Sequence, residues 1–98
     1  MTLGGAHGCA ILRDETVRCW GENQHGEVGD GTQVDRLVPT TVIGLTRVRQ
    51  LALGFRHSCA LRSDGGVRCW GDNASGQLGD GTVQLRLHPQ PALVSYGL

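Results

Sequence analysis

The sequence has no lysine, few aromatic residues and no long hydrophobic run. All nine basic residues are arginines, and aromatic residues make up only 4% of the 98 residues. Because these arginines are spread along a chain of zero formal net charge, no nucleic-acid partner is expected. No apolar stretch reaches the length of a membrane span, and residues 1–5 lack the basic and apolar regions of a signal peptide. The sequence therefore predicts no membrane span.

Motifs that carry chemistry are absent as well. A phosphate-binding loop places a lysine after its glycines, whereas the glycine-rich runs here are GDGT at 29–32 and 79–82. Neither run has the alternating acidic ligands of an EF-hand, so Asp30 and Asp80 are expected to close their own turns through side-chain hydrogen bonds. No motif pairs a nucleophile with a base. We predict no enzymatic activity, no cofactor and no metal site.

Glycine, by contrast, is abundant, and the sequence repeats itself. Sixteen glycines are more than twice the usual share and indicate many tight turns. After a shift of 50 residues the run VRCWG at 17–21 returns at 67–71, and GDGT at 29–32 returns at 79–82. A period of about 40 to 50 residues is typical of solenoids and propellers.

Each repeat is expected to form one four-stranded blade. In the second repeat the candidate strands are 48–54, 57–62, 67–71 and 85–94, with a glycine-rich loop over 72–82. Pro89 and Pro91 favour an edge position for the last strand. The predicted fold is all-β, with a first repeat over 1–46 whose opening strand is truncated and a second repeat over 47–98.

The repeated pattern resembles that of the regulator of chromosome condensation family. Residues 54–82 follow GxxHxCALxxDGxVxCWGxNxxGQLGDGT almost throughout, and the first repeat departs from it at Ile11, Glu15 and 27–28. The resemblance implies part of a seven-bladed propeller, of the paired-cysteine type more typical of bacteria. Two repeats cannot close such a ring, so we expect the chain to need further blades or to self-associate.

The family's members have different activities, so the resemblance implies a protein-binding habit and not one function. We predict a non-catalytic scaffold that binds an unidentified protein. One alternative is an exchange-factor-like regulator of a small GTPase, by family analogy. The other is a secreted or surface adhesin, although its exposed aromatic residues would be few.

The four cysteines form two pairs with identical spacing. Cys9 and Cys19, like Cys59 and Cys69, lie opposite each other across a predicted hairpin turn, where a disulfide can form. Buried free thiols and, with a histidine, a zinc site are the alternatives. Disulfides predict an extracytoplasmic or secreted protein, of which this chain would be one part. Free thiols would be compatible with a cytoplasmic location.

The repeated histidines and tryptophans are expected to be structural. The rings of His7 and His57 are predicted to bond backbone groups of an adjoining loop. Trp20 and Trp70 are predicted to pack between blades, with a ligand-stacking platform as the alternative.

Loops that vary between the repeats are the expected contact surface, because loops on a rigid scaffold carry specificity. The junction 43–49 is one such stretch. The individual candidates are Gln24, His25, Asp35, Arg36, Ala74, Ser75 and Arg86.

Overall fold

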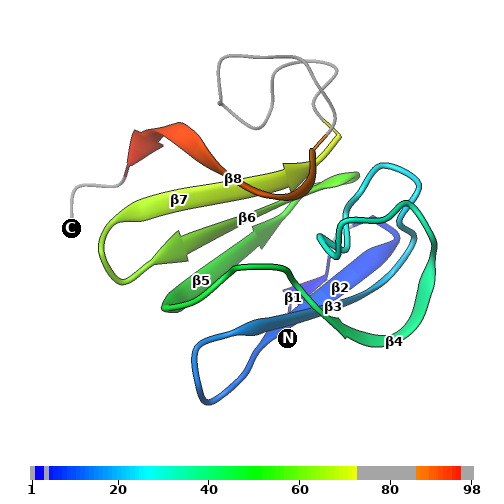
Figure 1. Cartoon of the computed structure of the whole chain (residues 1–98), viewed down its shortest axis with the longest axis horizontal. Coiled ribbons are helices and arrows are strands. Elements are labelled where there is room, and N and C mark those ends of the chain that lie inside the picture. Colours follow the sequence, from blue (N-terminus) through cyan, green and yellow to red (C-terminus); the bar gives the residue numbers. More distant parts are fainter. Residues whose placement is uncertain (1, 4, 73–85, 96–98) are drawn as a thin grey trace.

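The chain folds into two antiparallel sheets that lie side by side (Figure 1). The computed structural model describes residues 2–3, 5–72 and 86–95. The first sheet has the order β1 (Thr2–Leu3), β2 (His7–Ile11), β3 (Val17–Gly21) and β4 (Arg36–Thr41). The second has the order β5 (Val48–Leu53), β6 (His57–Arg62), β7 (Gly66–Gly71) and β8 (Arg86–Ser95). The predicted all-β class is confirmed, and β8 is an edge strand.

The two central hairpins are built alike. Cys9 pairs with Cys19 in the β2–β3 hairpin, and Cys59 pairs with Cys69 in the β6–β7 hairpin. The β6–β7 turn uses Gly65 at φ 84°, and the β2–β3 turn uses Glu15 at φ 68°. Glycine reaches this left-handed region freely, whereas a side chain is strained there. The β2–β3 turn therefore has more conformational strain than the β6–β7 turn.

The hydrophobic core lies between the two sheets. Its fully buried members come from both: Cys9, Val17, Cys19, Val28, Val42, Leu45, Val48, Ala60 and Trp70. Strand β5 lies beside β1 and β2, so the sheets meet near their first strands. The cystine face of the first sheet thus packs against the face of the second sheet that bears Trp70.

Among the described residues, no further sheet packs on the outer face of either sheet. Trp20, which occupies in the first sheet the position of Trp70 in the second, is only half-buried. On the second sheet, Cys59 and Leu61 are partly buried beside Val67 and Cys69. In the part of the chain that the structure describes, each blade therefore packs against another blade on one face only.

Candidate functional site

Four residues from both blades meet in a hydrogen-bonded junction. Ser58 on β6 donates from its hydroxyl to the backbone carbonyl of Glu27, at 3.0 Å, and Trp70 donates from its indole Nε1 to the same carbonyl, at 2.7 Å. His7 on β2 bonds the Ser58 hydroxyl through Nε2, at 2.8 Å. All four residues are at least 96% buried, because none exposes more than 4% of its surface. Since each bond crosses between the repeats, the junction holds one blade against the next.

The junction fixes where the His7 proton lies. A serine hydroxyl has one proton, and Ser58 gives it to the Glu27 carbonyl. His7 must then donate from Nε2 to the Ser58 oxygen, which leaves Nδ1 as an unprotonated acceptor. Nδ1 is buried and has no hydrogen-bond partner among the described residues. Burial, with a smaller contribution from His57, lowers the pKa of His7 from 6.5 to about 4. The imidazole is therefore neutral at physiological pH.

The ring of His7 does not bond the loop backbone directly, whereas the sequence predicts such a bond for both repeated histidines. His7 reaches the loop backbone only through Ser58, which is why the hydroxyl is required. His57 is half-buried on the second blade. The ring of His57 lies directly over Gly54, where an added Cβ would collide with it, so a glycine is required at that position.

The glycine-rich loop 22–35 is organised around a buried asparagine. Asn23 donates from Nδ2 to the carbonyls of Thr32 and Val34, both at 3.0 Å, and its Oδ1 accepts from the Val28 amide at 2.9 Å. This network holds Val28 in the core and presents the Glu27 carbonyl to the other blade. Asn23 recurs in the repeat as Asn73, and this recurrence is the sequence signal that could have identified it.

Asp30 closes the next turn of the loop. Its Oδ1 accepts from the Thr32 amide at 3.0 Å and the Thr32 hydroxyl at 2.7 Å. Its Oδ2 accepts from Arg36 Nε at 2.6 Å. Burial raises the pKa of Asp30, but the bonds from Thr32, Arg36 and Asn23 outweigh it, so the net pKa is lowered. These bonds all lie within residues 23–36, so the Asp30 carboxylate stabilises the turn. Asp80 lies outside the described residues.

The predicted contact residues divide between exposed and internally bonded positions. Asp35, though exposed, accepts from the Asn23 amide at 2.9 Å, and Arg36 is bonded to Asp30. Gln24 is exposed, and the half-buried His25 lies 3.8 Å from the buried carboxylate of Glu27. Ala74 and Ser75 lie outside the described residues, and only the backbone of Arg86 is described, in β8.

Both predicted disulfides are present. They join Cys9 to Cys19 and Cys59 to Cys69, each with a Cα–Cα distance of 4.1 Å. The sulfur atoms therefore do not act as zinc ligands. In residues 2–3, 5–72 and 86–95, no cluster of three potential ligands could hold a metal ion. Within the same segments, no helix is long and apolar enough to span a membrane.

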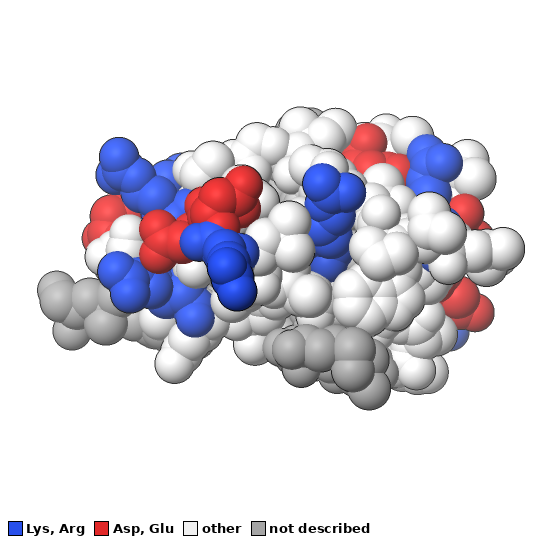
Figure 2. All heavy atoms as spheres, turned by 90° about the horizontal axis from the view of Figure 1, so that it is seen from below, with Lys and Arg blue, Asp and Glu red and all other residues white. Residues whose placement is uncertain are grey.

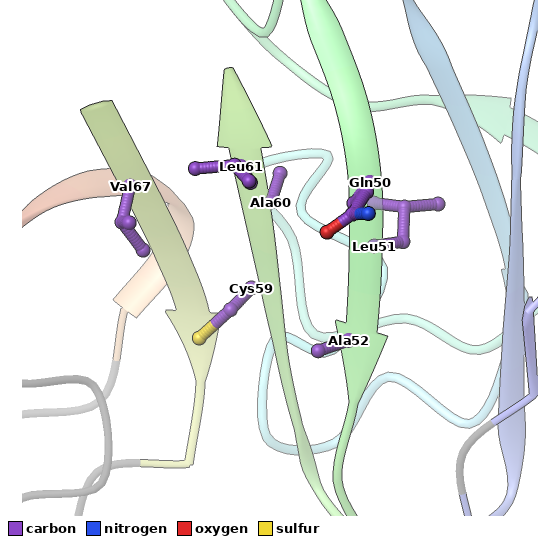
Figure 3. Close-up of a pocket in the computed structure, with 7 residues that line it drawn as sticks. All are labelled: Gln50, Leu51, Ala52, Cys59, Ala60, Leu61 and Val67. Atoms are coloured by element: carbon purple, nitrogen blue, oxygen red, sulfur yellow. The ribbon is translucent and has the colours of Figure 1, made fainter. Parts of the chain in front are cut away.

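A shallow cavity of about 110 Å³ marks the outer face of the second blade (Figure 3). It is lined by Gln50, Leu51, Ala52, Cys59, Ala60, Leu61 and Val67. Apart from Gln50 the lining residues are apolar or cysteine, and Ala60 and Leu51 also belong to the core between the blades. Such a surface suits packing and not chemistry. A more open hollow of about 350 Å³, lined by Arg49, Gln50, Leu61 and Ser63, adjoins it at the hairpin-turn end.

Four-stranded sheets that repeat every 50 residues and pack face to face define a β-propeller repeat protein. Residues 14–61 and 64–96 match the regulator of chromosome condensation (RCC1) repeat, and residues 48–77 match a second description of that repeat. The chain therefore belongs to the RCC1 repeat family. No curated protein matches the chain.

Solved structures show the same fold. Human WBSCR16 has a TM-score of 0.81 at 25% identity, over 94% of this chain and 25% of that protein. Yeast RCC1 (Prp20), solved with Kap60, has a TM-score of 0.84 at 20% identity, over 95% and 24%. Prp20p of Saccharomyces cerevisiae, characterised for binding to Gsp1p and histones, has a TM-score of 0.75 at 25% identity, over 98% and 25%. The chain spans about a quarter of these proteins' length.

Proposed function

We propose that the chain is a non-catalytic, protein-binding segment of a β-propeller, made of two adjacent blades. The observation that carries the proposal is the junction of His7, Ser58, Glu27 and Trp70. It joins one repeat to the next in a fixed order, so the arrangement can be extended by another repeat on either side. A rigid array of this kind presents loops as a binding surface.

The contact surface in this proposal includes the exposed part of loop 22–35. Gln24 and His25 are its leading members, because Asp35 and Arg36 are already committed to bonds within the loop. The partner is a protein. The disulfides favour an oxidising compartment, outside the cytoplasm. Thiol alkylation and mass spectrometry of the protein from its source cells would show both cystines, and free thiols would contradict this location.

Photo-crosslinking tests the proposal in the source cells. A photoreactive amino acid would replace Gln24 in the intact gene product, and Thr41 on the edge strand β4 would be the matched exposed control. A defined protein crosslinked from position 24 and not from position 41 is the expected result. Equal yields from both positions, or none from position 24, would refute binding through this loop.

A further inference from the structure

The β2–β3 turn, the inter-blade linker 45–49 and the β6–β7 turn lie together at one end of the molecule, called here the turn end. Two backbone hydrogen bonds join them. The Val48 amide donates to the Glu15 carbonyl at 3.0 Å, and the Ser63 amide donates to the Arg47 carbonyl at 2.8 Å. Segments that are far apart in the sequence therefore form one continuous surface.

This surface has an excess of positive charge, although the formal net charge of the whole chain is zero. Six of the nine arginines lie in or beside the three segments: Arg13, Arg18, Arg47, Arg49, Arg62 and Arg68. Three of the nine acidic residues lie there: Asp14, Glu15 and Asp64. Figure 2 shows arginine side chains gathered around a few acidic ones at one end of the molecule. The described acids that remain lie at the opposite ends of the strands.

The three acids of the turn end are already engaged. Asp14 accepts from the Thr16 hydroxyl at 2.6 Å, and this bond lowers the pKa of Asp14. Asp64 accepts from the Gly66 amide at 2.9 Å, which, with nearby arginines, lowers the pKa of Asp64. Glu15 lies 3.4 Å from Arg49. Among the described residues, Arg13 and Arg47 have no carboxylate within 4.0 Å, so both guanidinium groups are open to a ligand.

Arg47 has an unusual backbone for an arginine. Its φ is 58°, in the left-handed region where a side chain is strained. The neighbouring bonds to Glu15 and Ser63 hold the chain in this conformation, and the side chain is exposed. Glycine would relieve the strain, yet the sequence has arginine. Strain of this kind is found at functional sites.

We propose that the turn end binds an acidic segment of a partner protein, with Arg13, Arg47 and Arg49 as contact residues. The proposal rests on the proposed protein-binding function and adds the chemistry of the partner. Arginine forks match carboxylates in a bidentate way. The hollow beside Arg49, with Gln50 and Ser63 as further donors, gives a carboxylate a concave place to bind.

A nucleic acid fits this surface less well. Its evenly spaced phosphates would lie over Asp14, Glu15 and Asp64 as well as over the arginines. Single-stranded nucleic acids also need aromatic side chains for stacking, and residues 12–18, 45–49 and 62–68 contain none. A peptide with spaced carboxylates avoids both problems.

Fluorescence anisotropy with a labelled glutamate-rich peptide tests the proposal on the oxidised 98-residue chain. Binding should weaken as salt is added. Arg47→Gly should weaken it about twofold to fivefold, the range of one exposed ion pair, while the unfolding midpoint stays the same or rises. Adding Arg13→Gln and Arg49→Gln should weaken it further. Arg56→Gln removes the same charge from the opposite end and should leave the affinity unchanged.

Three outcomes would overturn the proposal. They are an equal loss in Arg56→Gln, no binding at low salt, and tighter binding of an oligothymidylate of equal length than of the peptide. If any of these occurs while position 24 still crosslinks one protein, the propeller remains a protein-binding scaffold and only this surface is wrong.

Discussion

At the scale of single residues, one backbone carbonyl connects the two blades. The Glu27 oxygen accepts from Ser58 and from Trp70, and His7 is held through Ser58. Unsatisfied buried polar groups are costly, so each of these side chains fixes the position of the others. The junction therefore joins the two blades through three hydrogen bonds in addition to their shared apolar core.

His7 should make the junction sensitive to acid. Its pKa is about 4 in the folded chain against 6.5 for a free histidine, so the unfolded chain takes up the proton first as pH falls. The contribution of neutral His7 to the free energy of unfolding is therefore complete above pH 6.5. It is lost progressively as the pH falls to about 4, and it changes no further below that pH. The difference corresponds to roughly 3 kcal/mol.

Urea unfolding between pH 7 and pH 4 measures this effect. His7→Gln is the control, because an amide can still donate to Ser58 but does not titrate in this range. The wild-type chain should lose more stability than the variant over the interval. Parallel stability curves for the two proteins would show that His7 does not titrate in the way its burial predicts.

The repeat provides a matched pair of tryptophans. Trp70 is fully buried between the blades, and its counterpart Trp20 is half-buried on the outer face of the first blade. Trp70→Ala should destabilise the chain by roughly 3 to 5 kcal/mol, and Trp20→Ala should destabilise it clearly less. The urea midpoints of the two variants measure this difference. Similar losses of stability in both would mean that burial between the blades does not determine how much each tryptophan contributes.

The sequence predicted those residues of the junction that the repeat makes visible. His7 and Trp70 recur as His57 and Trp20 at the 50-residue period, so their positions could be predicted before the fold was known. Ser58 could not, because the equivalent residue in the first repeat is Gly8. The role of Glu27 depends on its backbone carbonyl, which no side-chain pattern reveals.

At the scale of elements, strand positions could be predicted because they depend on local sequence. The clustering of charge on the surface could not, because it depends on contacts between distant segments. Strands β6 and β7 follow from short apolar runs on either side of a glycine-containing turn. The arginines of the turn end lie in three segments, and only the hydrogen bonds between those segments bring them together. These arginines are dispersed along the chain and clustered in space, so their grouping could not be predicted from the sequence.

The β2–β3 turn should be improved by a single substitution. Glu15 has a φ of 68°, where Gly65 of the other hairpin has 84°. Glu15→Gly removes a strain of about 1 to 2 kcal/mol and loses an exposed ion pair with Arg49 worth less than about 1 kcal/mol. We expect a small net gain in stability. Gly65→Glu, the reverse change, should destabilise. A lower urea midpoint for Glu15→Gly than for the parent would show that the ion pair outweighs the strain.

At the scale of the whole molecule, the internal interface is a template for association. The face with Trp70 and Ala60 packs against the cystine face of the first blade. The equivalent residues Trp20 and Ala10 lie on the outer face of the first blade, and Cys59 and Cys69 lie on the outer face of the second. A second copy could therefore pack head to tail on the first in the same way as blade packs on blade.

Such an interface would lack the two hydrogen bonds that the Ser58 hydroxyl makes in the internal one. His57 occupies the position of His7, but the residue equivalent to Ser58 in the incoming copy is Gly8. We expect the isolated 98-residue chain to self-associate, because no further blade packs on the outer faces of its two described sheets. Light scattering should show a mass that is above that of a monomer and that rises with protein concentration.

Two substitutions test the geometry of this interface. Gly8→Ser should strengthen association by supplying a hydroxyl to His57. Trp20→Arg should weaken it without unfolding the chain, since Trp20 lies outside the buried core. A cooperatively folded monomer at high concentration, unaffected by either substitution, would mean that the outer faces do not bind each other.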